Sequence, residues 1–329
     1  MIRILSRQDV QRAVTMVEAI DTVQAAYIHL SQGEATVPVR LALQVPKQDG
    51  VVLYMPAYLS RSDGLGAKVV TIFPHNPQMG LPTIHALVVV NDARTGAPIA
   101  IIEGGYLTAL RTGAASGVAT RLLARPDARV AAIFGAGGQG RTQLEGVCAV
   151  RNIEQVWVYD RNLQAAQRFV AEMSTRGGRI PMDIRVASSP HEAAREADVI
   201  CTATTSKTPV FDDADLKPGV HINGIGAFTH EMQEIPSETI RRALVVVDNV
   251  AACLAEAGDL IIPLNQGLIG RDHFATEIGQ VAAGLRPGRT DANQITFFKS
   301  VGNAVQDISV AQLILQRAAD LGLGIEVAL

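Results

Sequence analysis

Cysteines, metal-ligand spacings and long apolar runs are scarce in this chain of 329 residues. Its three cysteines are odd in number and far apart, so neither a disulfide framework nor a zinc cluster is expected. No H-x-x-x-H or C-x-x-C spacing occurs, and no apolar run approaches the ~20 residues that span a bilayer. The first residues, Met1–Arg7, lack the apolar segment of a signal peptide. We therefore predict no metal site and no membrane segment, with a reducing cytoplasm as the simplest location.

An excess of one charge is also missing. The chain has 29 Lys and Arg against 32 Asp and Glu, a formal net charge of −3, and no block of like charges. A nucleic acid or an anionic membrane is therefore not expected as the main partner. Hydrophobic residues make up 48% of the chain and charged residues 19%, which is typical of a globular protein. The length corresponds to about two domains.

The first part of the chain predicts one helix and then a sheet. Ser6 and Asp9 have the spacing of a capping box, and an amphipathic helix is expected from there to Gly33. Because no helix separates the strands that follow, they are expected to pair antiparallel. Only one face of such a sheet needs burial, which leaves the other for a second subunit or a pocket. The predicted strands are Val39–Val45, Val51–Met55, Leu65–Phe73, Ile84–Val90 and Pro98–Ile102.

From Gly105 onward the pattern changes to alternating helices and strands. A helix rich in Ala and Gly is predicted over Gly105–Ala124, and a short buried strand over Arg129–Phe134. Such alternation predicts a doubly wound parallel sheet covered on both faces. The tail Ser300–Leu321 is again amphipathic. We therefore predict an α/β protein in which residues 116–304 form a Rossmann domain. Residues 1–115 and 305–329 then form a smaller α+β domain with a mainly antiparallel sheet.

A glycine-rich loop indicates a dinucleotide site. Gly135-Ala136-Gly137-Gly138-Gln139-Gly140 matches G-x-G-x-x-G, follows a buried strand and opens a helix. Gly135 permits the tight turn, Gly137 lets the backbone approach a pyrophosphate, and Gly140 lets helix and strand pack closely. The helix N-terminus adds N–H groups and partial positive charge. A glycine turn without a ligand is the alternative, and the context favours the cofactor.

Asp160 ends the next strand, twenty positions beyond Gly140. Its carboxylate can accept hydrogen bonds from both ribose hydroxyls and would repel a 2′-phosphate, which favours NAD over NADP. The neighbouring Arg161 can bind that phosphate, so NADPH is not excluded. The alternatives are a helix N-cap for Asp160 and a merely exposed Arg161. Thr202, Ala203 and Thr204 follow another strand at the carboxyl edge, where ligands of such sheets bind; an ordinary polar loop is the alternative there.

Three cations lie in apolar surroundings. Lys68 shares a strand face with Val70 and Ile72, Arg40 precedes another apolar run, and Arg111 lies in the small-residue helix. A lysine there is costly unless it is paired, although a side chain reaching out from the sheet edge is equally possible. Together the three cations suggest an anionic ligand, most simply a carboxylate.

Two histidines, His75 and His85, flank the loop before the fourth predicted strand. Either is a candidate proton carrier or ligand for a second anion. An ordinary loop histidine and a half-buried strand histidine are the favoured interpretations.

The chain resembles the ornithine cyclodeaminase/μ-crystallin family along nearly its whole length. Members are typically homodimers built on the smaller domain, with NAD(P) in the cleft between the domains, and the resemblance implies the same here. The segments that carry it are Gly66–Lys68, Gly80–Thr83, Ala109–Ala114, Gly135–Gly140, Glu256–Leu260 and Phe298–Gly302.

The resemblance also implies site residues. Arg40, Lys68 and Arg111 would face the substrate carboxylate, with Lys68 close to the reacting centre as the catalytic residue. Thr83 and Thr112 would line the same cleft, with Thr83 on the substrate side. The implied cofactor-binding residues are Arg111, Thr112, Gly135, Ala136, Gly137, Gly138, Gln139, Asp160, Arg161, Thr202, Ala203, Thr204, Ile225, Gly226, Ser300, Val301 and Gly302.

One departure from the family pattern decides the expected reaction. Ornithine cyclodeaminases carry an aspartate that handles the side-chain amine, and Phe228 occupies its place here. A phenyl ring cannot accept a proton or pair with an ammonium group, so ornithine cyclodeamination is not expected. We predict an NAD(H)-dependent imine reductase, or amino-acid dehydrogenase, in which the cofactor supplies hydride and the protein supplies position and charge. A deaminating lyase with catalytic NAD and a non-catalytic NAD(P)-binding protein are the alternatives.

The substrate stays open among iminosuccinate, pyrroline-2-carboxylate and the imine of pyruvate. Iminosuccinate would need a further cation, for which His75, His85 and His230 are candidates. Pyrroline-2-carboxylate would need an apolar wall, for which Phe228 and Met55 are candidates.

Overall fold

The computed structural model describes residues 1–328, which form two compact units. One unit comprises Met1–Arg111 and the residues from Asn303 onward, and the other comprises Thr112–Gly302. Helix α3 (Gly104–Leu123) runs from the first unit into the second. The predicted fold class is confirmed, since one sheet is mainly antiparallel and the other is parallel and Rossmann-like. No helix of the described residues is long and apolar enough to cross a membrane.

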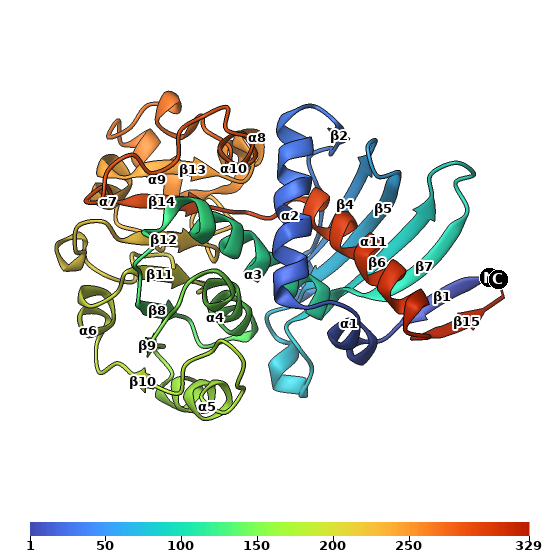
Figure 1. The fold of residues 1–329 in the computed structure, drawn as a ribbon, viewed down its shortest axis with the longest axis horizontal. Helices are drawn as coiled ribbons and strands as arrows, with labels where there is room; N and C mark the ends of the chain where they lie inside the picture. The colour runs from blue at the N-terminus through green and yellow to red at the C-terminus, as the bar shows by residue number, and fades with distance from the viewer. Residues whose placement is uncertain (329) are drawn as a thin grey trace. The chain divides into compact units, whose positions relative to one another are not determined.

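The first unit is built on a mixed eight-stranded sheet, in the order β15-β1-β7-β6-β5-β4-β2 with β3 beside β4. All neighbouring strands are antiparallel except β1 and β7, which pair in parallel. Helix α11 (Ala304–Asp320) packs against α2 (Met16–Ser31) and lies across β4, β5 and β6 (Figure 1). The strands are β1 (Ile2–Leu5), β2 (Ala35–Thr36), β3 (Leu41–Val45), β4 (Gly50–Leu59), β5 (Gly64–Ile72), β6 (Ile84–Asp92), β7 (Pro98–Glu103) and β15 (Ile325–Val327), with 3-10 helices η1 (Pro46–Gln48) and η2 (Asn76–Met79).

The single helix predicted up to Gly33 is wrong, because two helices occupy that stretch. Ser6 and Asp9 do form a capping box, and they start α1 (Arg7–Ala13). Val14 is extended, and Thr15 and Glu18 form a second capping box that starts α2. Two consecutive N-terminal caps therefore divide one continuous apolar pattern.

The second unit contains a seven-stranded parallel sheet, in the order β10-β9-β8-β11-β12-β14-β13. Alternate residues of β8 enter two different cores: Ala131 and Ile133 face one, and Ala132 and Phe134 face the other. Both faces are therefore covered, as a doubly wound sheet requires. The strands are β8 (Val130–Phe134), β9 (Gln155–Tyr159), β10 (Ile184–Val186), β11 (Val199–Thr202), β12 (His221–Gly224), β13 (Leu244–Val247) and β14 (Thr296–Lys299). The helices are α4 (Gly138–Val150), α5 (Leu163–Met173), α6 (Pro190–Arg195), α7 (Ser237–Arg242), α8 (Val250–Glu256), α9 (Gly258–Asn265) and α10 (Ile278–Ala282), with η3 (Asp213–Asp215) and η4 (Arg271–Phe274).

Candidate functional site

The glycine-rich loop joins β8 to α4 in the second unit. Gly135 has φ +102, and a Cβ there would lie 2.5 Å from the carbonyl oxygen of Ala203, so only glycine fits the turn. A Cβ on Gly137 would meet no atom of the described residues within 4 Å, which leaves the backbone open to a ligand. Gly137 is also the N-cap of α4, where N–H groups and the helix dipole favour an anion.

Asp160 lies at the end of β9 and is bound to this loop. One carboxylate oxygen accepts a hydrogen bond from the backbone N–H of Ala136 at 2.8 Å, and the other accepts one from the N–H of Asn162 at 2.8 Å. Helix α5 is capped by Asn162, so Asp160 is not its N-cap. Arg161 is exposed. Since a carboxylate has about four acceptor positions, Asp160 keeps capacity for ribose hydroxyls.

A cavity of about 410 Å³ opens beside Asp160. Its lining combines the glycine loop, the end of β9 and the loop after β11, all at the carboxyl ends of parallel strands. This is the place where doubly wound sheets bind nucleotides, and the lining fits the adenosine half of a dinucleotide. Predicted cofactor residues that line it are Gly135, Gly137, Asp160, Arg161, Ala203 and Thr204.

The loop glycines are also supported by a residue that the sequence did not single out. The guanidinium of Arg141, on α4, donates to the carbonyl oxygens of Ala136 at 2.8 Å and Gly137 at 3.0 Å. Its Nε pairs with Glu172 at 2.7 Å. Of the other loop residues, Gln139 is half-buried and Gly138 is exposed.

Two buried carboxylates accept hydrogen bonds from the donor groups of the other predicted cofactor loops. Glu234 accepts from Thr202, Thr204 and Gly226 of the loops after β11 and β12. Asp248 accepts from the hydroxyl of Ser300 at 2.8 Å and from the backbone N–H groups of Val301 at 3.0 Å and Gly302 at 2.9 Å. These donors therefore fix the loops in shape, and Ile225 lies half-buried beside Gly226.

Lys68 lies in the first unit and is fully buried, with a relative exposure of 1%. Its Nζ is 2.8 Å from each carboxylate oxygen of Asp307, on α11. The pKa of Lys68 is lowered to about 7: burial is the largest cause, the positive charge of Arg111 also lowers it, and Asp307 acts in the opposite direction. The interpretation of Lys68 as a side chain reaching out from the sheet edge is therefore wrong, because α11 supplies a buried partner.

Arg111 completes this cluster. Its Nε donates to Asp307 at 2.9 Å and its Nη1 donates to Gln306 at 2.6 Å. The side-chain amide of Gln306 also bonds the hydroxyl of the buried Tyr27. The pKa of Asp307 is lowered by the charges of Arg111 and Lys68, although burial, the largest single influence, raises it. One carboxylate and two cations leave a net positive site, which suits an anionic substrate.

The other predicted site residues have more varied places. Arg40 is half-buried between β2 and β3, and its charge acts on Lys68. Thr83 is half-buried in the loop before β6, and Thr112 is buried in α3. His75 is bound to Asp49 at 2.9 Å and half exposed, and both His85 and His230 are exposed. Phe228 is half-buried in the loop after β12.

Asp307 is the partner that sequence reasoning missed. It lies in the first turn of α11, where an acidic residue is ordinary because it favours the helix dipole. A signal was nevertheless present: Val310, Ala311 and Ile314 follow at helical spacing, which places the carboxylate on an apolar face. A carboxylate on such a face requires a partner, just as Lys68 does.

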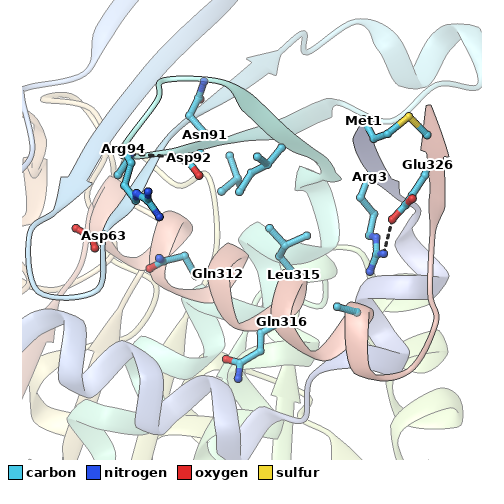
Figure 2. A pocket seen from close by; sticks show the side chains of 14 residues that line it. Met1, Arg3, Asp63, Asn91, Asp92, Arg94, Gln312, Leu315, Gln316 and Glu326 are labelled. Atoms are coloured by element: carbon cyan, nitrogen blue, oxygen red, sulfur yellow. Dashed lines mark hydrogen bonds and ion pairs between the residues drawn. The ribbon is translucent and has the colours of Figure 1, made fainter. Parts of the chain in front are cut away.

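A second cavity, of about 560 Å³, lies on the first unit between the β6–β7 turn and α11 (Figure 2). Arg3 is paired there with Glu326 at 2.6 Å, and Asp92 accepts from the backbone N–H groups of Arg94 and Thr95 in its own turn. Its lining includes none of the predicted substrate residues, so it is separate from the cluster around Lys68.

The fold and these residues define a protein of the Rossmann dinucleotide-binding class with a separate buried cation cluster. A model of the ornithine cyclodeaminase/mu-crystallin family matches residues 2–321. A Delta(1)-pyrroline-2-carboxylate reductase from Bacillus cereus is 39% identical over 322 residues, covering 98% of each chain. The chain therefore belongs to the ornithine cyclodeaminase/mu-crystallin family, as its motifs predicted.

Solved structures with a similar fold support this family assignment. The Delta(1)-pyrroline-2-carboxylate reductase of Thermococcus litoralis in complex with NADH and L-proline matches with a TM-score of 0.96 and 43% identity, covering 99% of this chain and 100% of that one. An archaeal alanine dehydrogenase dimer with bound NAD matches with a TM-score of 0.92 and 35% identity, covering 99% of each chain.

Proposed function

We propose that this protein reduces Δ1-pyrroline-2-carboxylate, a cyclic 2-imino acid, to proline with NADH. The observation that carries the proposal is the buried cluster of Lys68, Asp307 and Arg111 beside an apolar strand surface. The class of reaction is shown by the relatives: the chain is an NAD(H)-dependent oxidoreductase acting on C=N bonds. Bound NADH supplies the hydride, and the glycine loop and Asp160 would hold its adenosine side.

Arg111 and Arg40 bind the substrate carboxylate. Arg111 directs one N–H to Asp307 and one to Gln306, and a guanidinium carries five N–H donors in a planar fork. The remaining donors suit a carboxylate held through two oxygens. Asp307 and Gln306 fix the guanidinium, so the imino acid meets an oriented group.

Lys68 holds the proton for the imine nitrogen at Nζ. A proton donor works best when its pKa lies near the working pH, and that of Lys68 is lowered to about 7, mainly by burial. Asp307 keeps the ammonium oriented and partly compensates the cost of burying it.

The residues beside Lys68 favour a ring over a second carboxylate. Directly across from Lys68 are Met55 on β4 and Val88 on β6, both buried and apolar. Iminosuccinate needs another cation, but His75 is engaged by Asp49 and His85 is exposed. An apolar wall next to the proton donor suits the methylene groups of a five-membered ring.

The deaminating lyase is disfavoured by Phe228. The lyase needs an acceptor for a second amine, and the loop after β12 offers a phenyl ring at that position.

We also propose a homodimer formed through the open face of the first sheet. Helix α11, with α2 packed against it, covers one face, while the opposite face is apolar and half-buried or exposed. A contiguous apolar face of this kind marks an interaction surface, and the archaeal alanine dehydrogenase with the same fold is a dimer. The face comprises Tyr54, Tyr58, Leu65, Ala67, Val69, Leu87, Val89 and Ile101.

The cytoplasm is the proposed location. All three cysteines are free and buried, and burial raises the pKa of Cys148 and Cys201 to about 12. Unpaired thiols of this kind are typical of a reducing compartment.

The test follows the absorbance of NADH with purified protein and separate imines: pyrroline-2-carboxylate, oxaloacetate with ammonia, and pyruvate with ammonia or methylamine. We expect stoichiometric oxidation with pyrroline-2-carboxylate at the highest kcat/KM. Preference for oxaloacetate with ammonia would refute the apolar-wall argument. Conversion of ornithine to proline and ammonia with only trace NAD would establish the lyase instead, and tight cofactor binding without turnover would establish a binding protein.

A further inference from the structure

Glu234 is a fully buried carboxylate that the proposed mechanism does not use. It lies between β12 and α7, and both of its oxygens accept hydrogen bonds. Oε1 accepts from the N–H of Thr204 at 2.6 Å and from its hydroxyl at 2.7 Å. Oε2 accepts from the hydroxyl of Thr202 at 2.9 Å and from the N–H groups of Gly226 at 2.7 Å and Ala227 at 3.1 Å. One carboxylate therefore joins the loop after β11 to the loop after β12.

The backbone of Glu234 is fixed in turn by a buried ion pair. Asp259 accepts from the backbone N–H groups of Glu234 at 2.7 Å and Ile235 at 3.0 Å. The other oxygen of Asp259 lies 2.8 Å from Nζ of Lys299, and both side chains are fully buried. Lys299 ends β14 and directly precedes Ser300. The network thus links the ends of three neighbouring strands, β11, β12 and β14.

The two loops approach each other so closely that position 226 admits no side chain. A Cβ on Gly226 would lie 2.5 Å from Oε1 of Glu234 and 2.2 Å from the carbonyl oxygen of Thr204. Burial and the charge of Asp259 raise the pKa of Glu234, while Lys299 and the bonds from Thr204 favour the ionised form. All five donors require an acceptor, and the carboxylate provides it.

We propose that Glu234 is a positioning residue for the dinucleotide: it holds the loops after β11 and β12 in the shape that receives the cofactor. The inference rests on the proposed function, because these loops serve a cofactor only if the chain binds NAD(H). Glutamine at position 234 would place an NH2 group against N–H and O–H donors. The hydrogen bonds that one of the two carboxylate oxygens accepts would therefore be lost. The substrate cluster around Lys68 belongs to the other compact unit, so the loss should fall on the cofactor.

The test compares Glu234→Gln with the wild-type chain in NADH binding, followed by NADH fluorescence, and in KM for each substrate. Losing one hydrogen bond to a charged group predicts that Kd for NADH rises about ten-fold or more, while KM for pyrroline-2-carboxylate changes less than about two-fold. The matched control is Glu238→Gln on α7, where the carboxylate is exposed and pairs with Arg241; its Kd for NADH should equal that of the wild type.

A folded Glu234→Gln variant with unchanged Kd for NADH overturns the inference. An equal loss of affinity for NADH and imino acid also overturns it, because that result describes a general structural role. If Glu234→Gln does not fold, Thr202→Val removes one donor and leaves the carboxylate in place. A rise in its Kd for NADH supports the inference, and no rise overturns it. A wild-type chain that fails to bind NADH refutes the proposed function, and this inference with it.

Discussion

At the scale of single residues, Lys68 is the residue on which the proposed chemistry depends. Lys68→Met keeps the length and apolar stem of the side chain but removes the proton, and Asp307 keeps Arg111 as its partner. We expect kcat for imine reduction to fall by roughly 10²–10⁴, the range of a general acid, while NADH still binds. Steady-state turnover and NADH fluorescence measure the two effects separately. Lys47→Met, at an exposed position of the same unit, is the control. Turnover near the wild-type value in Lys68→Met would remove Lys68 from the mechanism.

We also expect the pH dependence of the reaction to follow the titration of Lys68. Burial and the charge of Arg111 together lower its pKa to about 7, so Nζ carries its proton below that pH and loses it above. The kcat/KM for reduction should therefore fall about ten-fold per pH unit above about pH 7, and amino-acid oxidation should rise over the same range. In Lys68→Arg the guanidinium stays protonated, so any residual activity should not fall above about pH 7. The same fall in kcat/KM in both proteins would assign the titration to another group.

The shifted pKa of Lys68 also fixes the sign of its effect on stability. The unfolded side chain keeps its ordinary pKa of about 10.5, so between about pH 7 and 10.5 the unfolded chain binds more protons than the folded one. The contribution of Lys68 to the free energy of unfolding therefore increases with pH across this window. Below about pH 7 the Lys68 side chain is charged in both the folded and the unfolded chain, so the full free-energy cost of burying the charge lowers stability there.

At the scale of elements, we expect the β9–α5 turn to determine the choice between cofactors. Asp160→Ser removes the charge that repels a 2′-phosphate and leaves Arg161 free to bind it. We expect the ratio of kcat/KM for NADH to that for NADPH to fall about ten- to a hundred-fold, the value of one or two charged hydrogen bonds. Asp160→Ser with Arg161→Ala should lose the gained NADPH activity. An unchanged ratio in the single variant would show that another element distinguishes the 2′-hydroxyl of NADH from the 2′-phosphate of NADPH.

Elements could be predicted where the local pattern and the tertiary contacts agree. The ends of β6, β7 and β8 lie within two residues of their predicted positions, because turn or glycine residues bound each apolar run. The short edge strands β1, β2 and β15 were missed, since they are defined by partners far away in the sequence. Strand β14 was missed although Phe297 and Phe298 form an apolar run.

The residues of the candidate site also divide into those that the sequence could single out and those that it could not. Lys68 and Arg111 could be singled out because a cation in an apolar segment is unusual, whereas Asp307 and Glu234 stand in segments where a carboxylate is ordinary. Only the fold reveals that each is surrounded by donors. The roles of the predicted site residues remain predictions, for which the variants above provide the tests.

At the scale of the whole molecule, the open sheet face makes assembly a testable property. Leu87 lies near the middle of that face, directly across from Val69 on β5, and is 42% exposed in the single chain. In a two-fold dimer the same patch meets itself, so Leu87→Lys would bury two like charges close together. We expect light scattering after size exclusion to give about 70 kDa for the wild type, twice the 34.9 kDa of the chain, and the monomer mass for Leu87→Lys. Leu163→Lys, the same substitution at an exposed leucine of α5 in the other unit, should leave the dimer intact. A Leu87→Lys protein that stays dimeric would place the interface elsewhere, because no well-packed apolar interface tolerates an unpaired lysine at its centre.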